Sequence, residues 1–278
     1  MPPIKAGLIG LPLNRSLSPQ LFTILAGLCG REVEYSLWEC GTAKFQEAVA
    51  KARAESWAGF NVTLPDKQLL AGDLSDKKDR AASIAGSANC ARFTPEGLEA
   101  RNTDAAAMAA AMLDRGMDLT GKKAAVYGSG GSAATSAYVL ASAGAEDVTF
   151  YARDPVRAGP AIGRVSAAFP GSVFSVAPFG PADGVDAVIN ATPIGMYEEG
   201  HLPVEPAKDQ VCVDWPYSPG GTFFTRRARE LGAHVIDGME LLVRQGVLSL
   251  FLWGGCRESD IADIIREARK LLREKTGG

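Results

Sequence analysis

One short segment restricts the fold more than any other: a glycine-rich turn between a strand-like run and a helix-like run. The apolar residues 124–127 are followed by GSGGSA at 128–133 and then by small residues at helical spacing. This is a G-x-G-x-x-A fingerprint in the strand–turn–helix context of a dinucleotide-binding βαβ unit. Gly128 permits the tight turn, Gly130 lets a pyrophosphate approach the backbone, and Ala133 lets the helix pack close to the strand. The expected phosphate-binding residues are Gly128, Ser129, Gly130, Gly131 and Ser132.

The end of the next predicted strand, residues 148–151, indicates which dinucleotide fits. An NAD site usually has Asp or Glu there for the ribose 2′-hydroxyl, whereas an NADP site has Arg near the 2′-phosphate. Here Ala152 stands at the place of the acid, Arg153 follows, and Arg157 offers a second guanidinium one helical turn further on. NADP is therefore favoured. NAD stays open, because Asp154 would either repel a phosphate or cap the following helix.

Short apolar runs alternate with helix-like segments along most of the chain, which indicates a parallel α/β architecture. Predicted strands cover residues 4–10, 33–38, 59–62, 124–127, 148–151, 185–190 and 211–214. Predicted helices cover residues 19–29, 42–54, 103–115, 131–143, 222–231 and 260–274. Ser18 is the expected N-cap of the first helix, with Pro19 at its first position. Gly and Pro interrupt residues 155–184, for which no definite element is predicted.

The alternation forms two series, one before about Asp104 and one from about Lys122. Between them, residues 103–115 are rich in Ala and Met, as expected for a buried helix that joins two domains. A chain of 278 residues suits two domains of roughly 100–150 residues each.

The composition excludes several classes of protein. Apolar residues make up 46% and charged residues 22%, as in ordinary folded proteins. The net charge is −3 and no basic run is present, so a nucleic-acid partner is not supported. The longest uncharged run, residues 124–145, contains four Gly and is too polar to span a membrane. Residues 1–13 are interpreted as a first strand and not as a signal peptide. No membrane partner is expected.

The five cysteines are odd in number and no two lie within four residues of each other. This spacing argues against a disulfide framework and a zinc clip, and it favours a reducing cytoplasm. His201 and His234 lie in no motif typical of metal ligation or of a Ser-His-Asp triad. We expect both at the surface or in loops, and we predict no metal site.

Oxidation of an alcohol by hydride transfer needs a base, which here has to be a lysine or a carboxylate. The predicted strand 59–62 is followed by Thr63 and Pro65, and Lys67 lies in the first turn of the helix that the proline begins. Ligands of open α/β sheets bind at the carboxyl ends of strands, which makes Lys67 a candidate. A lysine in such a position, taken by itself, is more often a surface lysine. A second polar group, RNTD at 101–104, falls at the boundary of the two series.

Several segments, in order along nearly the whole chain, resemble the shikimate dehydrogenase family. They are GLP at 10–12 with SLSP at 16–19, NVTLPDK at 61–67, NTD at 102–104, NATPIGM at 190–196, and DG at 237–238 with QG at 245–246. The resemblance implies an open α/β substrate domain over 1–104, a Rossmann NADP-binding domain over 105–238, and C-terminal helices over 239–278 that return to the first domain. It implies reversible reduction of 3-dehydroshikimate to shikimate with NADPH, in aromatic amino-acid biosynthesis.

The resemblance also implies a role for each matching residue. Lys67 would be the acid/base, paired with Asp104. Substrate and cofactor contacts would come from Ser16, Ser18 and Tyr217 at the substrate carboxylate, Thr63, Asn89 and Gln245 at the ring hydroxyls, and Trp215 and Gly238 at the nicotinamide. A free lysine titrates at about 10.4, so burial has to lower the pKa of Lys67 while Asp104 raises it.

Some positions depart from the family pattern. The family commonly has His where this chain has Arg15, His-Asn where it has Phe22 and Thr23, and His where it has Asp66. Residues 152–154 read ARD in place of Asn-Arg-Thr, residues 214–221 are unusual around Tyr217, and Ser132 replaces a common Ala. These departures predict a divergent member, for which quinate or an aminoshikimate relative with NAD is the alternative.

A non-catalytic dinucleotide-binding sensor is the alternative from a different class, and the presence of both Lys67 and Asp104 argues against it. The expected partner is a small-molecule substrate, and a homodimer is left open.

Overall fold

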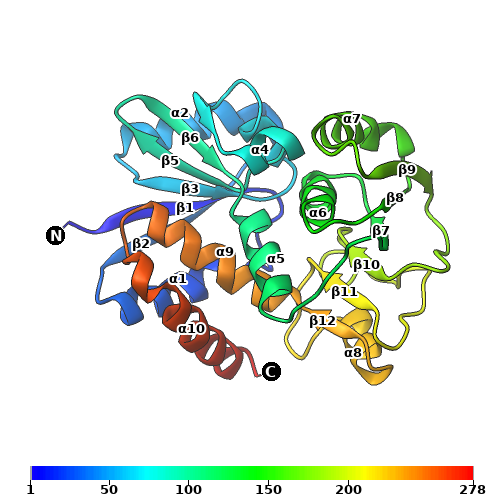
Figure 1. Ribbon diagram of the computed structural model, residues 1–278. Helices are drawn as coiled ribbons and strands as arrows, with labels where there is room; N and C mark the ends of the chain where they lie inside the picture. Colours follow the sequence, from blue (N-terminus) through cyan, green and yellow to red (C-terminus); the bar gives the residue numbers. More distant parts are fainter. Residues whose placement is uncertain (1, 278) are drawn as a thin grey trace. The chain divides into compact units, whose positions relative to one another are not determined.

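Two six-stranded sheets organise the chain, one in each of two units (Figure 1). The structure is a computed structural model that describes residues 2–277. The first unit comprises the described residues up to Ser83, Ser87–Asp104, and those from Leu242 onward. The second unit comprises Ile84–Gly86 and Ala105–Leu241.

The sheet of the first unit is mixed, with the strand order β2-β1-β3-β5-β6-β4. Its strands are β1 (Ile4–Gly10), β2 (Val33–Glu39), β3 (Gly59–Val62), β4 (Lys77–Lys78), β5 (Cys90–Thr94) and β6 (Gly97–Arg101). β1 runs parallel to β2 and β3, whereas β5 runs antiparallel to β3 and β6. The parallel pattern expected from the sequence is therefore wrong for the β5–β6 hairpin. This hairpin turns at Pro95-Glu96, and Gly97 supplies a backbone φ of 134°.

Helices cover both faces of the first sheet. They are α1 (Ser18–Cys29), η1 (Thr42–Lys44), α2 (Phe45–Ala54), α3 (Lys67–Leu70), α4 (Arg80–Ala85), α9 (Gly238–Leu252), η3 (Glu258–Asp260) and α10 (Ile261–Thr276). Figure 1 shows α9 and α10 beside α1. Ile9, Phe45 and Phe60 are fully buried in the core between α2 and the sheet.

The expected N-cap of α1 is wrong by one residue. Leu17 is the N-cap, and Ser18 is already the first helical residue. The Ser18 amide instead donates to the Ser16 hydroxyl at 3.2 Å, so a serine two residues earlier satisfies a free helix N–H.

The second sheet is entirely parallel, with the strand order β12-β11-β10-β7-β8-β9. Its strands are β7 (Lys123–Tyr127), β8 (Asp147–Ala152), β9 (Val173–Pro178), β10 (Ala187–Asn190), β11 (Val211–Asp214) and β12 (His234–Ile236). This is the doubly wound order of a Rossmann sheet, in which the first strand, β7, lies between the second strand, β8, and the fourth, β10. A dinucleotide is expected at the carboxyl ends around β7.

The helices of the second unit also lie on both faces of their sheet. On these faces are α6 (Gly131–Ser142), η2 (Pro155–Ala158), α7 (Gly159–Ala168) and α8 (Phe223–Glu230). The unit also holds most of α5 (Thr103–Leu113), whose first two residues belong to the first unit. Figure 1 shows α6 and α7 together on one face and α8 on the other. Residues 155–184, for which no definite element was expected, hold η2, α7 and the edge strand β9.

None of the helices among residues 2–277 combines the length and the apolar character needed to cross a lipid bilayer.

Candidate functional site

A buried ion pair lies at the centre of the polar site in the first unit. Lys67 is the first residue of α3, and Asp104 is the second residue of α5. The Lys67 Nζ donates to Asp104 Oδ2 at 2.6 Å, and the two side chains are only 15% and 7% exposed. Lys67 is therefore not the surface lysine that a reading of the residue alone allowed. A short, shielded contact of this kind holds the amine in one position, which a proton-transfer group requires.

Asn89 ties this ion pair to two other elements. Its side-chain amide donates to Thr103 Oγ1 at 2.8 Å, Asp104 Oδ1 at 3.1 Å and Gln245 Oε1 at 3.2 Å. Its side-chain oxygen accepts the backbone N–H of Asp104 at 3.2 Å. Asn89, directly before β5, thus shares one network with residues of α5 and α9. Asn89 and Gln245, both predicted site residues, lie in this network with Asp104.

A second group of buried hydrogen bonds, centred on Asn61, supports the network. The sequence analysis assigned no role to its residues. Asn61, on β3, donates to Ser249 Oγ at 2.8 Å and to the Asn89 carbonyl oxygen at 3.2 Å, and it accepts from the Tyr35 hydroxyl at 2.9 Å. Asn61 belongs to the NVTLPDK segment, and a polar residue inside a buried strand could have indicated a buried hydrogen-bond network. Nothing local marks Tyr35 or Ser249, since their relevance depends on pairing with Asn61.

The remaining predicted substrate residues of the first unit follow strand ends on one edge of its sheet. Thr63 comes directly after β3, and Ser16 and Ser18 come shortly after β1. β1 and β3 are parallel neighbours, with Ile9 opposite Val62, so their carboxyl ends meet. Ser18 is buried, and Thr63 and Ser16 are partly exposed.

The glycine-rich turn of the second unit has the geometry of a phosphate cradle. Gly128 has a φ of 120°, and a Cβ at this position would lie 2.7 Å from the Ala191 carbonyl oxygen. Around Gly130 a Cβ would meet nothing within 4 Å, so there is open space next to this backbone. Gly130 is the N-cap of α6 without any side-chain cap. Anions bind at helix amino ends of this kind, and this one begins a 12-residue helix.

The end of β8 carries the residues expected at the ribose. Ala152 is buried, whereas Arg153, Asp154 and Arg157 are exposed. Asp154 Oδ1 accepts the Val156 N–H at 3.2 Å, so this carboxylate caps η2. The Arg153 guanidinium donates two hydrogen bonds, at 3.0 and 3.1 Å, to the carboxylate of Glu198 in the segment after β10.

The segment after β11 holds the residues expected near the nicotinamide. Trp215 Nε1 donates to Ser136 Oγ at 2.8 Å, which connects this segment to α6. A Cβ on Gly238 would lie 2.3 Å from the Pro216 carbonyl oxygen, so only glycine fits between α9 and this segment. Tyr217, partly exposed, lies in the same segment.

Beneath this segment is a buried carboxyl group that the sequence analysis did not single out. Asp214 ends β11 and has no exposed surface. It accepts from Asn190 Nδ2 at 2.8 Å and from the Thr222 hydroxyl. Burial raises the pKa of Asp214 to about 7, although the hydrogen bonds from Thr222 and Asn190 act in the opposite direction. Through these two hydrogen bonds the carboxyl group links the end of β10 to the segment between β11 and α8.

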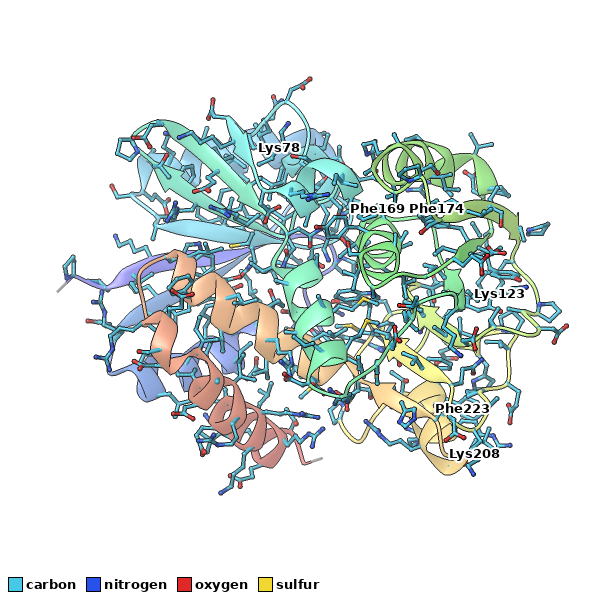
Figure 2. All side chains as sticks on the ribbon, in the orientation of Figure 1. Lys78, Lys123, Phe169, Phe174, Lys208 and Phe223 are labelled. Atoms are coloured by element: carbon cyan, nitrogen blue, oxygen red, sulfur yellow. The ribbon has the colours of Figure 1, made fainter. Side chains whose placement is uncertain are left out.

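The two histidines, His201 and His234, lie at the surface. Both histidines are exposed, as expected, and the His201 ring packs against Phe223, labelled in Figure 2, with ring centroids 4.0 Å apart. In the part of the chain that the structure describes, no group of three His, Cys, Asp or Glu side chains could hold a metal ion. All five cysteines are free thiols, and burial raises the pKa of Cys90, next to Asn89, to about 12.

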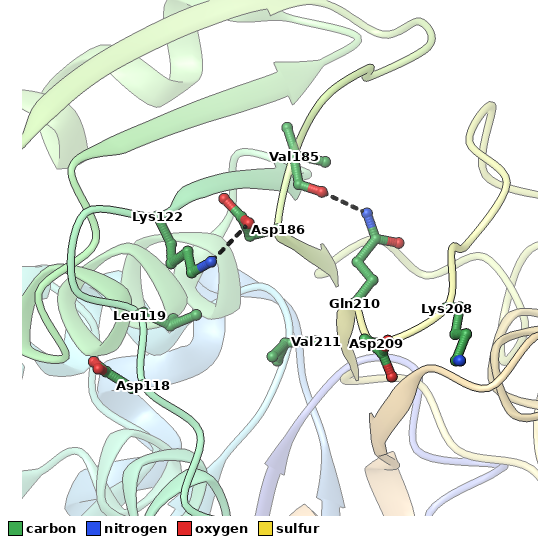
Figure 3. Close-up of a pocket in the computed structure, with 9 residues that line it drawn as sticks. All are labelled: Asp118, Leu119, Lys122, Val185, Asp186, Lys208, Asp209, Gln210 and Val211. Atoms are coloured by element: carbon green, nitrogen blue, oxygen red, sulfur yellow. Dashed lines mark hydrogen bonds and ion pairs between the residues drawn. The ribbon is translucent and has the colours of Figure 1, made fainter.

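A cavity of about 280 Å³ lies at the end of the second sheet where its strands begin, opposite the end that carries the glycine-rich turn (Figure 3). It is formed around the amino ends of β10 and β11. Its polar groups are largely paired: Lys122 Nζ lies 3.3 Å from Asp186 Oδ1, and Gln210 Nε2 donates to the Val185 carbonyl oxygen at 2.8 Å. Because dinucleotides bind at the carboxyl ends of such strands, this cavity is separate from the glycine-rich turn.

Comparisons with known proteins agree with this architecture. The family model of the shikimate dehydrogenase substrate binding domain matches residues 8–91. A shikimate dehydrogenase (NADP(+)) from Anaeromyxobacter sp. (strain K) is 34% identical over 275 residues, covering 96% of this chain and 97% of that protein.

Two solved structures extend the likeness to the whole fold. A shikimate dehydrogenase in complex with NADP+ has a TM-score of 0.80 and 26% identity, over 98% of this chain and 96% of that one. The ligand-free 5-ketofructose reductase of Gluconobacter sp. strain CHM43 has a TM-score of 0.79 and 27% identity, over 96% of this chain and 99% of that one. Sequence identity of this extent over nearly the full length establishes that the chain belongs to the shikimate dehydrogenase family.

Proposed function

We propose that this protein is a shikimate dehydrogenase that reversibly reduces 3-dehydroshikimate to shikimate with NADPH. The Lys67–Asp104 ion pair carries the proposal, because a largely buried amine held by a carboxylate at 2.6 Å suits proton transfer. The family membership and the NADP(+)-dependent names of the relatives support it.

In the proposed reduction, Lys67 donates a proton to the carbonyl oxygen as that carbon becomes a secondary alcohol. In the reverse direction Lys67 accepts the hydroxyl proton. Asp104 holds the amine at 2.6 Å and is itself held by Asn89, so the proton is exchanged at a constant position. A positioned acid/base contributes typically 10²–10⁴-fold to the rate.

Substrate recognition is assigned to the polar residues around this pair. Asn89 and Gln245 would bind ring hydroxyls, since both are oriented by a common network. Thr63 would do the same from the end of β3. Ser16 and Ser18 would bind the substrate carboxylate with their hydroxyl groups, and Tyr217 would assist them.

The second unit fits a phosphorylated dinucleotide on its own geometry. Gly128 admits no side chain, the backbone of Gly130 borders open space, and the amino end of α6 has no side-chain cap. Ser129, Gly131 and Ser132 complete this turn. NADPH, when bound, supplies the hydride. The chain would hold its pyrophosphate at this turn, while Trp215 and Gly238 would line the nicotinamide pocket.

At the ribose, we propose that Arg153 and Arg157 bind the 2′-phosphate. Ala152 leaves no acid at the end of β8, and Asp154 is occupied in capping η2. Both arginines are exposed and therefore reachable by a dianion.

The departures from the family pattern include Phe22 and Asp66. Phe22 is 1% exposed and stacks on Tyr35 with ring centroids 4.0 Å apart, so this position belongs to the core. Asp66 is 1% exposed and accepts from the Thr42 hydroxyl at 2.7 Å. Two of the departures are thus buried inside the first unit, so they add no side chain to its exposed surface.

A second candidate is reduction of a keto sugar, suggested by the structural likeness to 5-ketofructose reductase. Quinate and an aminoshikimate relative, with NAD, remain the nearer alternatives. We also propose a cytoplasmic location, which five free thiols fit. A homodimer stays a prediction that light scattering during size-exclusion chromatography tests.

The deciding experiment measures initial rates with shikimate and quinate, each with NADP+ and NAD+, and with 5-ketofructose plus NADPH. We expect the highest kcat/KM for shikimate with NADP+. Lys67→Ala should lower kcat by several orders of magnitude while leaving NADP+ affinity nearly unchanged. Lys77→Ala, at an exposed lysine of the same unit, is the control and should keep full activity.

A higher kcat/KM for another substrate would replace shikimate and retain the Lys67 chemistry. Near-full kcat in Lys67→Ala would remove Lys67 from the mechanism. Dinucleotide binding without turnover of any of these substrates would favour the non-catalytic sensor.

A further inference from the structure

An exposed ion pair joins the two strands that flank the glycine-rich turn. Arg153 Nη1 and Nη2 donate to Glu198 Oε2 and Oε1 at 3.0 and 3.1 Å, so both oxygens of the carboxylate are engaged. Arg153 directly follows β8, and Glu198 lies in the segment after β10. β7 lies between β8 and β10 in the sheet. The ion pair therefore connects the two sides of the dinucleotide position.

The backbone of an ordered loop places the Glu198 carboxylate. The Glu198 carbonyl oxygen accepts the Gly195 N–H at 2.9 Å, and Ile194 forms a β-bridge with Glu198. Asn190 Nδ2 in turn donates to the Ile194 carbonyl oxygen at 3.1 Å. Glu198 is consequently presented toward Arg153 by hydrogen bonds that begin at the end of β10.

The paired Nη1–H and Nη2–H donors of Arg153 form a fork that matches a carboxylate or a phosphate in bidentate fashion, and Glu198 occupies this fork. A 2′-phosphate that uses this fork has to displace Glu198. The freed carboxylate would then lie close to a dianion of the same sign, which opposes binding. The 2′-hydroxyl of NAD makes no such demand on Arg153.

We propose that Glu198 is a positioning residue that weakens the binding of 2′-phosphorylated dinucleotides by competing for Arg153. Glu198 thereby lowers the ratio of the affinity for NADP to the affinity for NAD. The proposal rests on the part of the proposed function that assigns Arg153 to the 2′-phosphate. Because exposed ion pairs are weak and screened by salt, the competition lowers the affinity by about fivefold at low salt and less at high salt.

Isothermal titration calorimetry of the full chain with two fragments, 2′,5′-ADP and 5′-AMP, tests this without turnover. Glu198→Gln keeps the shape of the side chain and removes its charge. We expect 2′,5′-ADP to bind about fivefold more tightly to this variant at low salt, and 5′-AMP affinity to change by less than about twofold. With NADP+, KM should fall while kcat stays constant.

Glu199→Gln is the matched control, because it removes the same charge from the exposed neighbouring residue. It should leave the affinity ratio of the two fragments unchanged. Arg153→Ala should weaken 2′,5′-ADP binding and abolish the effect of Glu198→Gln in the double variant.

Each contrary result has a distinct meaning. Unchanged or weaker 2′,5′-ADP binding in Glu198→Gln, with Arg153→Ala still harmful, overturns the proposal and leaves the phosphate assignment in place. Equal tightening of 5′-AMP, or an equal effect of Glu199→Gln, also overturns it. If Arg153→Ala does not affect 2′,5′-ADP binding, Arg153 does not bind the 2′-phosphate. That result overturns the assignment under the proposed function and, with it, the proposal about Glu198.

Discussion

Replacement of Asp214 by Asn should change how stability depends on pH. Asp214 has no exposed surface, and burial raises its pKa to about 7 from an ordinary value of 3.8. Hydrogen bonds from Thr222 and Asn190 and the charge of Arg229 lower this pKa, whereas Asp237 raises it. Between pH 3.8 and about 7 the folded protein therefore keeps a proton that the unfolded chain releases.

The sign and size of the effect follow from this difference in proton binding. The raised pKa contributes stability that is fully present below pH 3.8 and is lost as the pH rises to about 7. At about 1.4 kcal/mol per pH unit, the loss is roughly 4 kcal/mol in total, of which about 2 kcal/mol falls between pH 5 and 7. Asp214→Asn carries no titrating proton and should remove this slope.

Urea unfolding of both proteins at pH 5, 6, 7 and 8 measures the slope. The free energy of unfolding of the wild type should fall relative to that of Asp214→Asn by about 3 kcal/mol over this range. The slope is the quantity compared, because the amide also alters the hydrogen bonds by a pH-independent amount. Asp209→Asn, at an exposed residue with a φ of 62° that Asn tolerates, is the control and should parallel the wild type. Parallel curves for wild type and Asp214→Asn would show that Asp214 is ionised throughout and would refute the reasoning.

Three other substitutions test separate features. Asp104→Asn should lower kcat by about 10²-fold or more with little change in NADP+ affinity, because Lys67 loses the carboxylate that holds it; steady-state kinetics measure this, and unchanged kcat would contradict it. Glu240→Gln should lower the free energy of unfolding by about 2–3 kcal/mol, because the 1% exposed Glu240 holds Arg115 through both oxygens; a urea-measured loss below about 0.5 kcal/mol would show that the pair adds little. Gly59→Ala should cost more than about 3 kcal/mol, because its Cβ would lie 2.1 Å from a backbone oxygen of β5; a wild-type melting temperature would disprove this close approach.

Local patterns were sufficient to predict much of the fold. The predicted strands 4–10, 59–62 and 211–214 coincide with β1, β3 and β11, because buried parallel strands are short apolar runs bounded by turn residues. The glycine turn could also be predicted, since a φ of 120° at Gly128 excludes almost every other residue. The edge strand β9 was missed because half-exposed edge residues carry a weak apolar pattern.

The site was less accessible to sequence reasoning. Lys67 could be nominated from its place after a strand, but its pairing with Asp104 rested on a family resemblance. The two residues are 37 positions apart, and the segment between them contains no local signal for the contact. Asn61 stood inside a quoted motif, yet its partners Tyr35 and Ser249 come from distant segments. Contacts of this kind depend on which buried polar groups the packing brings within hydrogen-bond distance.

The sequence by itself therefore determined the features that depend on neighbouring residues: the α/β alternation, the glycine turn and the membership of a family. Tertiary structure alone decided the antiparallel hairpin β5–β6, the ionisation of Asp214 and the partner of Arg153. Arg153 looked available for a phosphate, whereas the fold places Glu198, 45 residues away, on its guanidinium. The physical reason is that strand periodicity and turn geometry act over a few residues. Burial and charge pairing instead depend on distances through space that only the folded chain defines.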